Sequence, residues 1–159
     1  MPRLLAAALT LGALLWSATL FVAPFTVRGT HPPLAAAAAF VYHGASLICH
    51  QRPERSFRFA GVQQPVCARC AGLYLSGCFG ALAAWAGSRR PRVPRGTRAL
   101  IALASVPTIL TLGLEVMAVA HPSNAVRAIA AVPLGGVAGW VFVRSLRAEG
   151  TAATAVGRT

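Results

Sequence analysis

The chain has 159 residues, of which 56% are hydrophobic and only 11% are charged. Soluble globular domains usually carry about a quarter charged residues, so this composition excludes an ordinary water-soluble fold and favours a single domain embedded in a lipid bilayer. All 15 basic residues are arginine, and with three acidic residues they give a net charge of +12. The arginines stand at the edges of apolar segments, as membrane topology requires, so this charge does not indicate nucleic-acid binding.

The first apolar segment, residues 4–25, is uninterrupted and long enough to cross a hydrocarbon core of about 30 Å. A cleavable signal peptide is the alternative. Its apolar core would be about 7–15 residues long, and a convincing small-residue cleavage site is missing before Pro24. We therefore expect a retained first helix.

The later apolar segments are separated by loops rich in proline, glycine and arginine, such as residues 26–33 and 88–98. They predict an all-α, polytopic membrane bundle of four or five transmembrane helices within one domain, residues 1–147, followed by a disordered tail at residues 148–159. The expected spans are residues 4–25, 34–48, 70–87, 99–120 and 125–143.

Positive charge predicts the orientation of the bundle. Residues 88–98 contain five arginines, and Arg144 and Arg147 directly follow the last span, so both regions are expected in the cytoplasm. The third helix then begins on the extracytoplasmic side. If residues 34–48 cross the membrane, there are five spans and an outer N-terminus; if they are re-entrant, there are four spans and an inner N-terminus. We favour five.

Cysteine and histidine are concentrated between the second and third helices. Cys67 and Cys70 have the spacing of a chelating pair, and Cys49 with His50 is a second source of ligands; the 17 residues between Cys49 and Cys67 are enough for the chain to fold back. Three thiolates and one imidazole would complete a tetrahedral site for zinc or iron. His43 lies seven residues before His50, hence on the same helix face, and is the alternative nitrogen ligand.

Two alternatives to a metal site stay open for this cysteine pair. The pair could exchange electrons with a quinone as a membrane thiol oxidoreductase, with Arg69 lowering the pKa of a thiolate, or it could be a structural disulfide of the outer loop. We favour the metal site, with zinc as the ion. Cys78 lies two to three helical turns deeper and is expected to be a buried apolar residue.

Three further arginines surround the cysteine motif: Arg52, Arg55 and Arg58. Clustered guanidinium groups near a membrane surface can bind a phosphate with two hydrogen bonds each, so a lipid phosphate is a candidate ligand. The alternative, which we favour, is that they pair with glutamates and backbone carbonyls.

Glu115 is a carboxylate inside an apolar span, and such a residue is a candidate functional group. A helical hairpin would bring it to the depth of Arg127, so we expect a structural ion pair. The alternative is a chemical role, with Glu115 and Arg69 as the candidate catalytic residues.

Small residues recur every four positions on two of the predicted helices. Gly72, Ser76 and Gly80 share one face, and Gly135 and Gly139 share another. Such faces let helices approach closely in lipid. We expect them to pack within the chain; a contact with a second copy or a partner subunit is the alternative.

The strings CHQRPERSF (residues 49–57) and GVQQPVCARCAGLYLSG (residues 61–77) resemble the signature of a membrane protein family of bacteria and archaea, domain of unknown function 2085. The match is close over residues 43–77. It is looser over the last hairpin, where Glu115, Asn124 and Arg127 fit the family pattern. The resemblance implies a small integral membrane protein in the cell membrane and brings no established activity.

The sequence thus predicts a Cys/His metal centre on the extracytoplasmic side. It leaves open whether the chain is an enzyme; a metal-dependent enzyme acting on a lipid phosphate is a further alternative.

Overall fold

The computed structural model describes residues 2–86 and 96–156. Its regular secondary structure is helical, apart from one short β-hairpin between the second and third helices. The helices are α1 (Pro2–Thr26), α2 (Pro32–Ser46), α3 (Ala68–Ala83), α4 (Thr97–Val116) and α5 (Asn124–Val156). Between α2 and α3 lie the 3₁₀ turn η1 (Pro53–Arg55) and the strands β1 (Arg58–Phe59) and β2 (Val62–Gln63).

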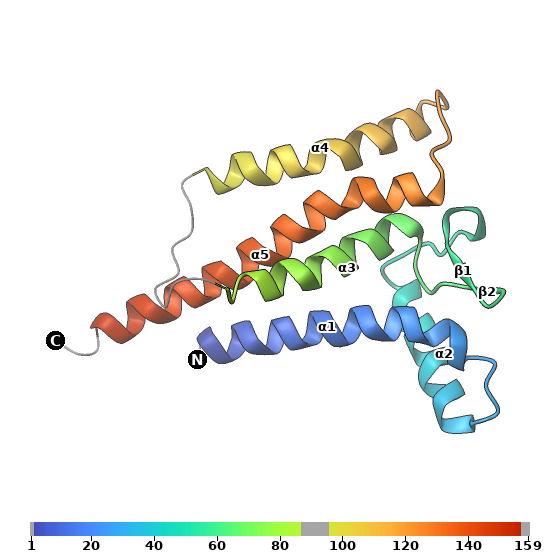
Figure 1. The fold of residues 1–159 in the computed structure, drawn as a ribbon, viewed down its shortest axis with the longest axis horizontal. Helices are drawn as coiled ribbons and strands as arrows, with labels where there is room; N and C mark the ends of the chain where they lie inside the picture. Colours follow the sequence, from blue (N-terminus) through green and yellow to red (C-terminus); the bar gives the residue numbers. More distant parts are fainter. Residues whose placement is uncertain (1, 87–95, 157–159) are drawn as a thin grey trace.

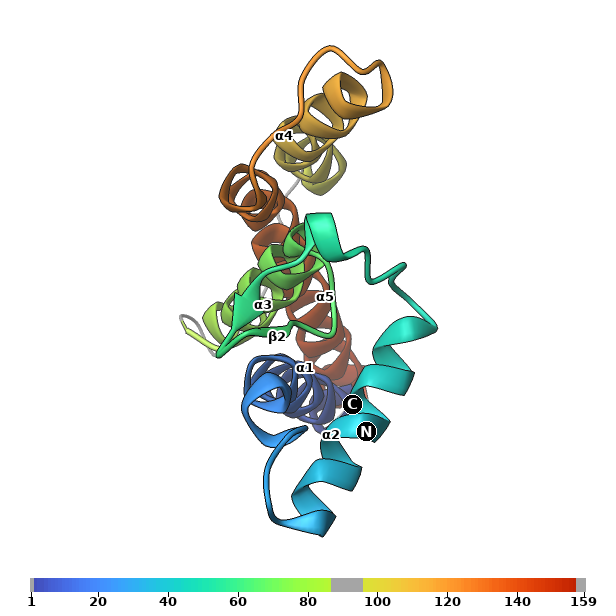
Figure 2. The same cartoon turned by 90° about the vertical axis from the view of Figure 1, so that its right-hand side faces the viewer.

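Four of these helices, α1, α3, α4 and α5, run lengthwise beside one another (Figure 1), and Figure 2 shows them nearly end-on. Within the described residues, three helical segments are long and apolar enough to cross a membrane: Pro2–Thr26, Thr97–Val116 and Asn124–Glu149. α3 is shorter and packs most extensively against α5. These observations confirm the predicted all-α membrane bundle.

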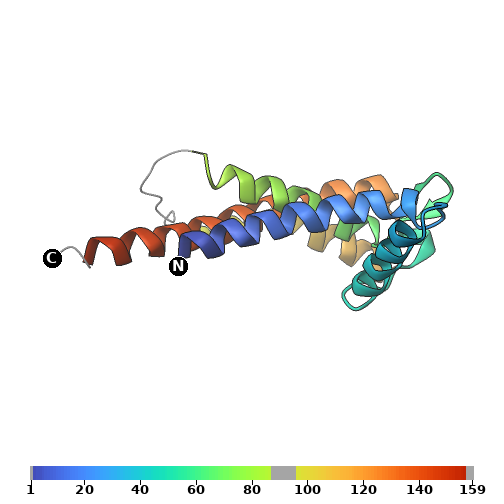
Figure 3. The same ribbon diagram turned by 90° about the horizontal axis from the view of Figure 1, so that it is seen from below.

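α2 lies across one end of the bundle instead of along it (Figures 1 and 3). Its 15 residues begin at a Pro-Pro pair, and at about 1.5 Å per residue they are too short for a hydrocarbon core. α2 therefore does not add a fifth span to the bundle, as the five-span order that we favoured requires. Within the described residues three helices are long enough to cross a membrane, and α3, with 16 residues, runs beside them. The N-terminus then lies at the same end as the last residues of α3 and the first of α4, opposite the hairpin.

α5 extends further than the sequence predicted. It continues to Val156 and so includes most of the segment expected to be a disordered tail. Residues 151–156 are mainly alanine and threonine without proline or glycine, and alanine has the highest helix propensity, so the last turns can continue beyond the apolar span. Residues 157–159 lie outside the described part of the chain.

α3 and α5 are in backbone contact along their glycine faces. A Cβ atom placed on Gly72 or Gly80 would collide with the backbone of α5, and one on Gly135 or Gly139 would collide with α3. Only glycine allows an approach this close. The two faces of small residues therefore cover each other within one chain, as we expected.

The hairpin was not predicted from the sequence. Its turn is formed by Ala60 and Gly61, which both have positive φ, +49° and +74°, as a two-residue hairpin turn requires. Phe59 stacks on Phe25 of α1 with ring centroids 5.9 Å apart. This contact packs the hairpin against the end of α1. The hairpin directly precedes α3, so the contact also positions the start of α3 beside the end of α1.

We predict that Gly80→Ala lowers the thermal stability of the purified protein in detergent, because the added methyl group must separate α3 from α5. Overpacking of this kind costs about 1–3 kcal/mol. Gly113→Ala on α4 is the matched control, since a Cβ at Gly113 meets nothing within 4 Å. Equal melting temperatures for the two variants would contradict the importance of this contact.

Candidate metal centre

Three cysteines converge where α2 ends and α3 begins. Cys49 follows the last turn of α2 and donates its backbone N–H to the carbonyl of Ala45 at 2.9 Å. Cys67 is the N-cap residue of α3, and Cys70 is in its first turn. The sulfur atoms of Cys49, Cys67 and Cys70 all lie within 4.8 Å of one another. The fold thus brings together the thiols of two segments that are 18 residues apart.

Two glutamine side chains hold these segments in place. The side-chain amide of Gln51 donates to the carbonyls of Tyr42 at 2.9 Å and Pro65 at 2.8 Å, which joins α2 to the chain before Cys67. The amide of Gln63 donates in turn to the carbonyl of Gln51. Neither glutamine was among the site residues predicted from the sequence, although Gln51 directly follows Cys49-His50 in the motif.

The first turn of α3 stabilises negative charge on sulfur. The backbone N–H of Cys67 points to the sulfur of Cys49, 3.2 Å away. The thiol of Cys70 donates a hydrogen bond to the sulfur of Cys67, which lowers the pKa of Cys67 to about 5 although partial burial opposes this shift. The lowered pKa favours the thiolate of Cys67, and the thiolate is the form that binds metals.

The two histidines proposed as nitrogen ligands do not join the thiols. Among the described residues, the group close enough to hold one ion consists of the three cysteines alone. His50 is exposed and lines the cavity beside them, while His43 is exposed on α2. Cys78 is buried further along α3, where its thiol donates to the carbonyl of Leu75 at 3.0 Å.

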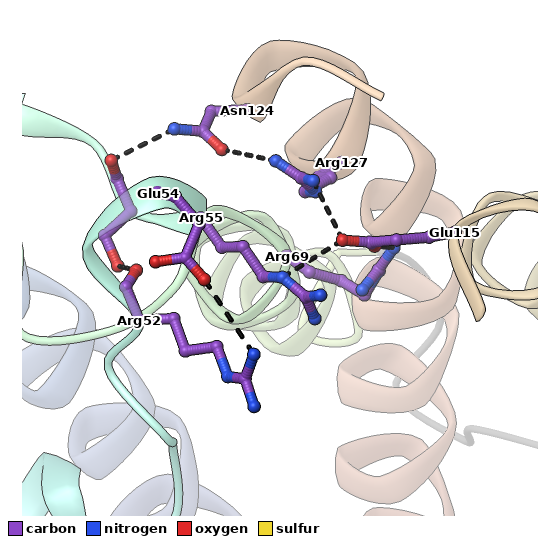
Figure 4. A network of polar contacts seen from close by, with 8 residues as sticks. Arg52, Glu54, Arg55, Arg69, Glu115, Asn124 and Arg127 are labelled. Carbon is purple, nitrogen blue, oxygen red and sulfur yellow. Dashed lines mark hydrogen bonds and ion pairs between the residues drawn. The ribbon is translucent and has the colours of Figure 1, made fainter. Parts of the chain in front are cut away.

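Glu115 is surrounded by arginines, as Figure 4 shows. Its carboxylate lies 2.8 Å from Arg127 of α5, the partner that the sequence indicated. It also lies 3.0 Å from Arg55 of η1 and 3.4 Å from Arg69 of α3. Only 3% of the Glu115 side chain is exposed. One buried carboxylate thus binds three guanidinium groups from three separate elements.

This arrangement changes the role expected for Arg69. The sequence placed it between the two cysteines as a group that lowers a thiolate pKa, but its guanidinium points to Glu115 instead. The remaining arginines of the motif are exposed. Arg52 lies 3.9 Å from Glu54, and Arg58 is on the outer side of β1.

A second set of contacts ties the start of α5 to the motif. Arg127 donates to the side-chain oxygen of Asn124 at 2.8 Å, and the amide of Asn124 donates to the carbonyl of Ser56 at 3.0 Å. Figure 4 shows this chain of contacts continuing to Glu115. The last hairpin is therefore part of the site.

A cavity of about 360 Å³ lies between the thiols and the arginines. Its wall combines the three cysteines with His50 and the basic residues Arg52, Arg55, Arg69 and Arg127. Thiol and guanidinium groups therefore face the same space.

Residues 49–141, more than half of the chain, match the model of a family described as "Predicted membrane protein (DUF2085)". The chain belongs to this family. An uncharacterised protein of Methanothermobacter thermautotrophicus is 34% identical over 88 residues, which are 55% of this chain and 78% of that protein. An uncharacterised protein of Methanocaldococcus jannaschii is 56% identical over 34 residues, which are 21% of this chain and 22% of that protein. No solved structure matches the chain.

The matched region begins at Cys49 and includes Glu115 and Arg127, so the family pattern covers both halves of the site. The names of the relatives carry no activity, and the chemistry of the site has to be inferred from its geometry.

We predict that Glu115→Gln destabilises the protein by about 3 kcal/mol, because removing one partner leaves buried guanidinium groups uncompensated. Adding Arg127→Ala should recover only part of this loss, since Arg55 and Arg69 still face the neutral side chain. Unfolding of the three proteins in detergent measures both effects.

Glu54→Gln is the control for this series. Glu54 is exposed and lies 3.9 Å from Arg52, so its substitution should change stability by less than about 0.5 kcal/mol. Full recovery in the double variant would show that Arg127 alone balances Glu115.

Proposed function

We propose that the protein binds one transition-metal ion, with zinc favoured, through Cys49, Cys67 and Cys70. The observation that carries this proposal is the convergence of the three sulfur atoms within 4.8 Å. In a tetrahedral zinc site the Zn–S distance is about 2.3 Å, which separates neighbouring sulfurs by about 3.8 Å. The thiols therefore need only small rotations of their side chains to bind one ion. Iron prefers the same soft ligands and is the alternative metal.

Three thiolates leave one position of a tetrahedral ion open. This position would face the cavity, because the three cysteines and His50 line it together. Zinc sites with three protein ligands and one exchangeable position are typical of catalysis, whereas structural sites are closed by four protein ligands. We assign the fourth position to an exogenous ligand, with His50 at the rim of the cavity.

The distribution of charge supports an extracytoplasmic position for this centre. The segment that joins α3 to α4 carries five arginines at residues 88–98, and α3 and α4 lead away from it to the cysteines and Glu115. At the site, Arg55 and Arg69 are paired with the buried Glu115. Their charge is partly compensated, so the segment at 88–98 weighs more heavily as a cytoplasmic signal.

We predict that the purified protein contains about one equivalent of zinc or iron by elemental analysis. Replacing Cys49, Cys67 or Cys70 by serine should remove most of it, since thiolates dominate the affinity of such sites. Cys78→Ser is the matched control and should keep the metal, because Cys78 is buried away from the site. His50→Ala should also keep it.

A metal-free wild-type protein with Cys67 and Cys70 joined in a disulfide would contradict this proposal. A bound quinone in such a sample would then indicate a thiol oxidoreductase, and its absence a structural disulfide. Loss of metal in Cys78→Ser as large as in Cys67→Ser would show that the effect comes from misfolding.

We predict that a reporter inserted in residues 88–98 reports the cytoplasm. After metal removal, a membrane-impermeant thiol reagent added to intact cells should label Cys67 and Cys70. The control is Cys78 in a variant without the other three cysteines, which should stay unlabelled. Extracytoplasmic activity of the reporter would place the thiols in the reducing cytoplasm.

A further inference from the structure

The site carries more positive charge than its carboxylate can balance. Arg55, Arg69 and Arg127 contribute three positive charges and Glu115 contributes one negative charge, a difference of two. All three guanidinium groups line the cavity beside the cysteines. Like charges held close together repel one another unless an anion compensates them.

Hydrogen-bonding capacity at the site is also unused. Arg127 is only 7% exposed, yet its Nε–H has no hydrogen-bond partner among the described residues. The Nε–H of Arg69 is buried and equally unpartnered. Buried donors in native proteins are nearly always satisfied, and here both residues border a space of about 360 Å³. Each guanidinium group also carries terminal N–H groups, so the three arginines that line this space can hold a ligand with several acceptor oxygens.

We propose that this cavity binds the phosphate group of a phosphomonoester or inorganic phosphate, held by Arg55, Arg69 and Arg127. A phosphomonoester carries a charge of about −1.5 to −2 at neutral pH and three strong acceptor oxygens, so it can balance positive charge on the three arginines and accept several of their hydrogen bonds. Guanidinium groups bind such oxygens in pairs.

A phosphate held by the arginines would lie beside the three thiols and could also contact the proposed metal ion. An oxygen of the bound phosphate can occupy the open position of the metal ion, because both groups face the same cavity. This second contact rests on the proposed metal centre, whereas the contacts to the arginines do not. The site lies at the end of the bundle, where both a dissolved phosphate and a lipid headgroup can reach it.

The test compares two arginines of the same motif. Arg55 lines the cavity, whereas Arg58 is exposed on β1 and does not. Arg55→Gln and Arg58→Gln remove the same charge, so they separate a specific contact from a general electrostatic effect. Binding of inorganic phosphate is measured by titration calorimetry in detergent. Binding of a lipid headgroup is measured with phosphatidylcholine nanodiscs, with and without phosphatidic acid.

We expect Arg55→Gln to weaken phosphate binding at least tenfold and Arg58→Gln to change it less than twofold, since a hydrogen bond to a charged group is worth about 1.5–3 kcal/mol. Arg55→Lys keeps the charge but loses the paired geometry, and should weaken binding several-fold. If Arg55→Gln does not fold, Arg55→Lys is compared with wild type and Arg58→Gln in its place. Binding of inorganic phosphate identifies a soluble ligand; binding of phosphatidic acid alone identifies a lipid.

Two results would overturn the proposal. One is that neither phosphate source binds to the metal-loaded protein. The other is that Arg58→Gln weakens binding as much as Arg55→Gln. Elemental analysis of the same samples separates the two proposals: a metal-free wild-type protein that still binds phosphate through Arg55 would refute the metal centre and leave the anion site standing.

Discussion

The structure depends on the buried carboxylate of Glu115. It belongs to α4, and it binds arginines from η1, α3 and α5. These three elements are therefore connected to α4 through a single pair of oxygen atoms. Charge at this depth is tolerated only when it is paired, so the contacts that stabilise the fold also hold the arginines at the cavity.

Glycine contacts between α3 and α5 complement this ion-pair network. Lipid offers no hydrophobic driving force for helix association, so close backbone contact supplies the attraction instead. Gly80 and Gly139 bring α5 against α3 along most of its length. This contact fixes the start of α3, with Cys67 and Cys70, at the level of Arg127 near the start of α5. Helix packing in the membrane and the geometry of the site are thus coupled.

The cysteines and the arginines line one cavity. The proposed metal site is formed by the cysteines, and the proposed phosphate site is formed by the arginines. We propose that the cysteine sulfurs bind a cation and that the arginines bind an anion. A metal ion between them would have three protein ligands and an open position toward the basic wall. This combination is suited to chemistry on a phosphate group, in which a metal polarises one oxygen and guanidinium groups neutralise the others.

The sequence by itself determined the all-α membrane bundle, the cysteine spacing and the Glu115–Arg127 pair. Long apolar runs in lipid have few alternatives to helices, and neighbouring helices of a hairpin bring such residues to equal depth. Only the tertiary structure decided that α2 lies across the bundle, that Arg55 and Arg69 also reach Glu115, and that His50 stays outside the thiol group. These features depend on contacts between residues far apart in the chain, and periodicity and spacing reveal which residues share a face but not which distant residues meet there.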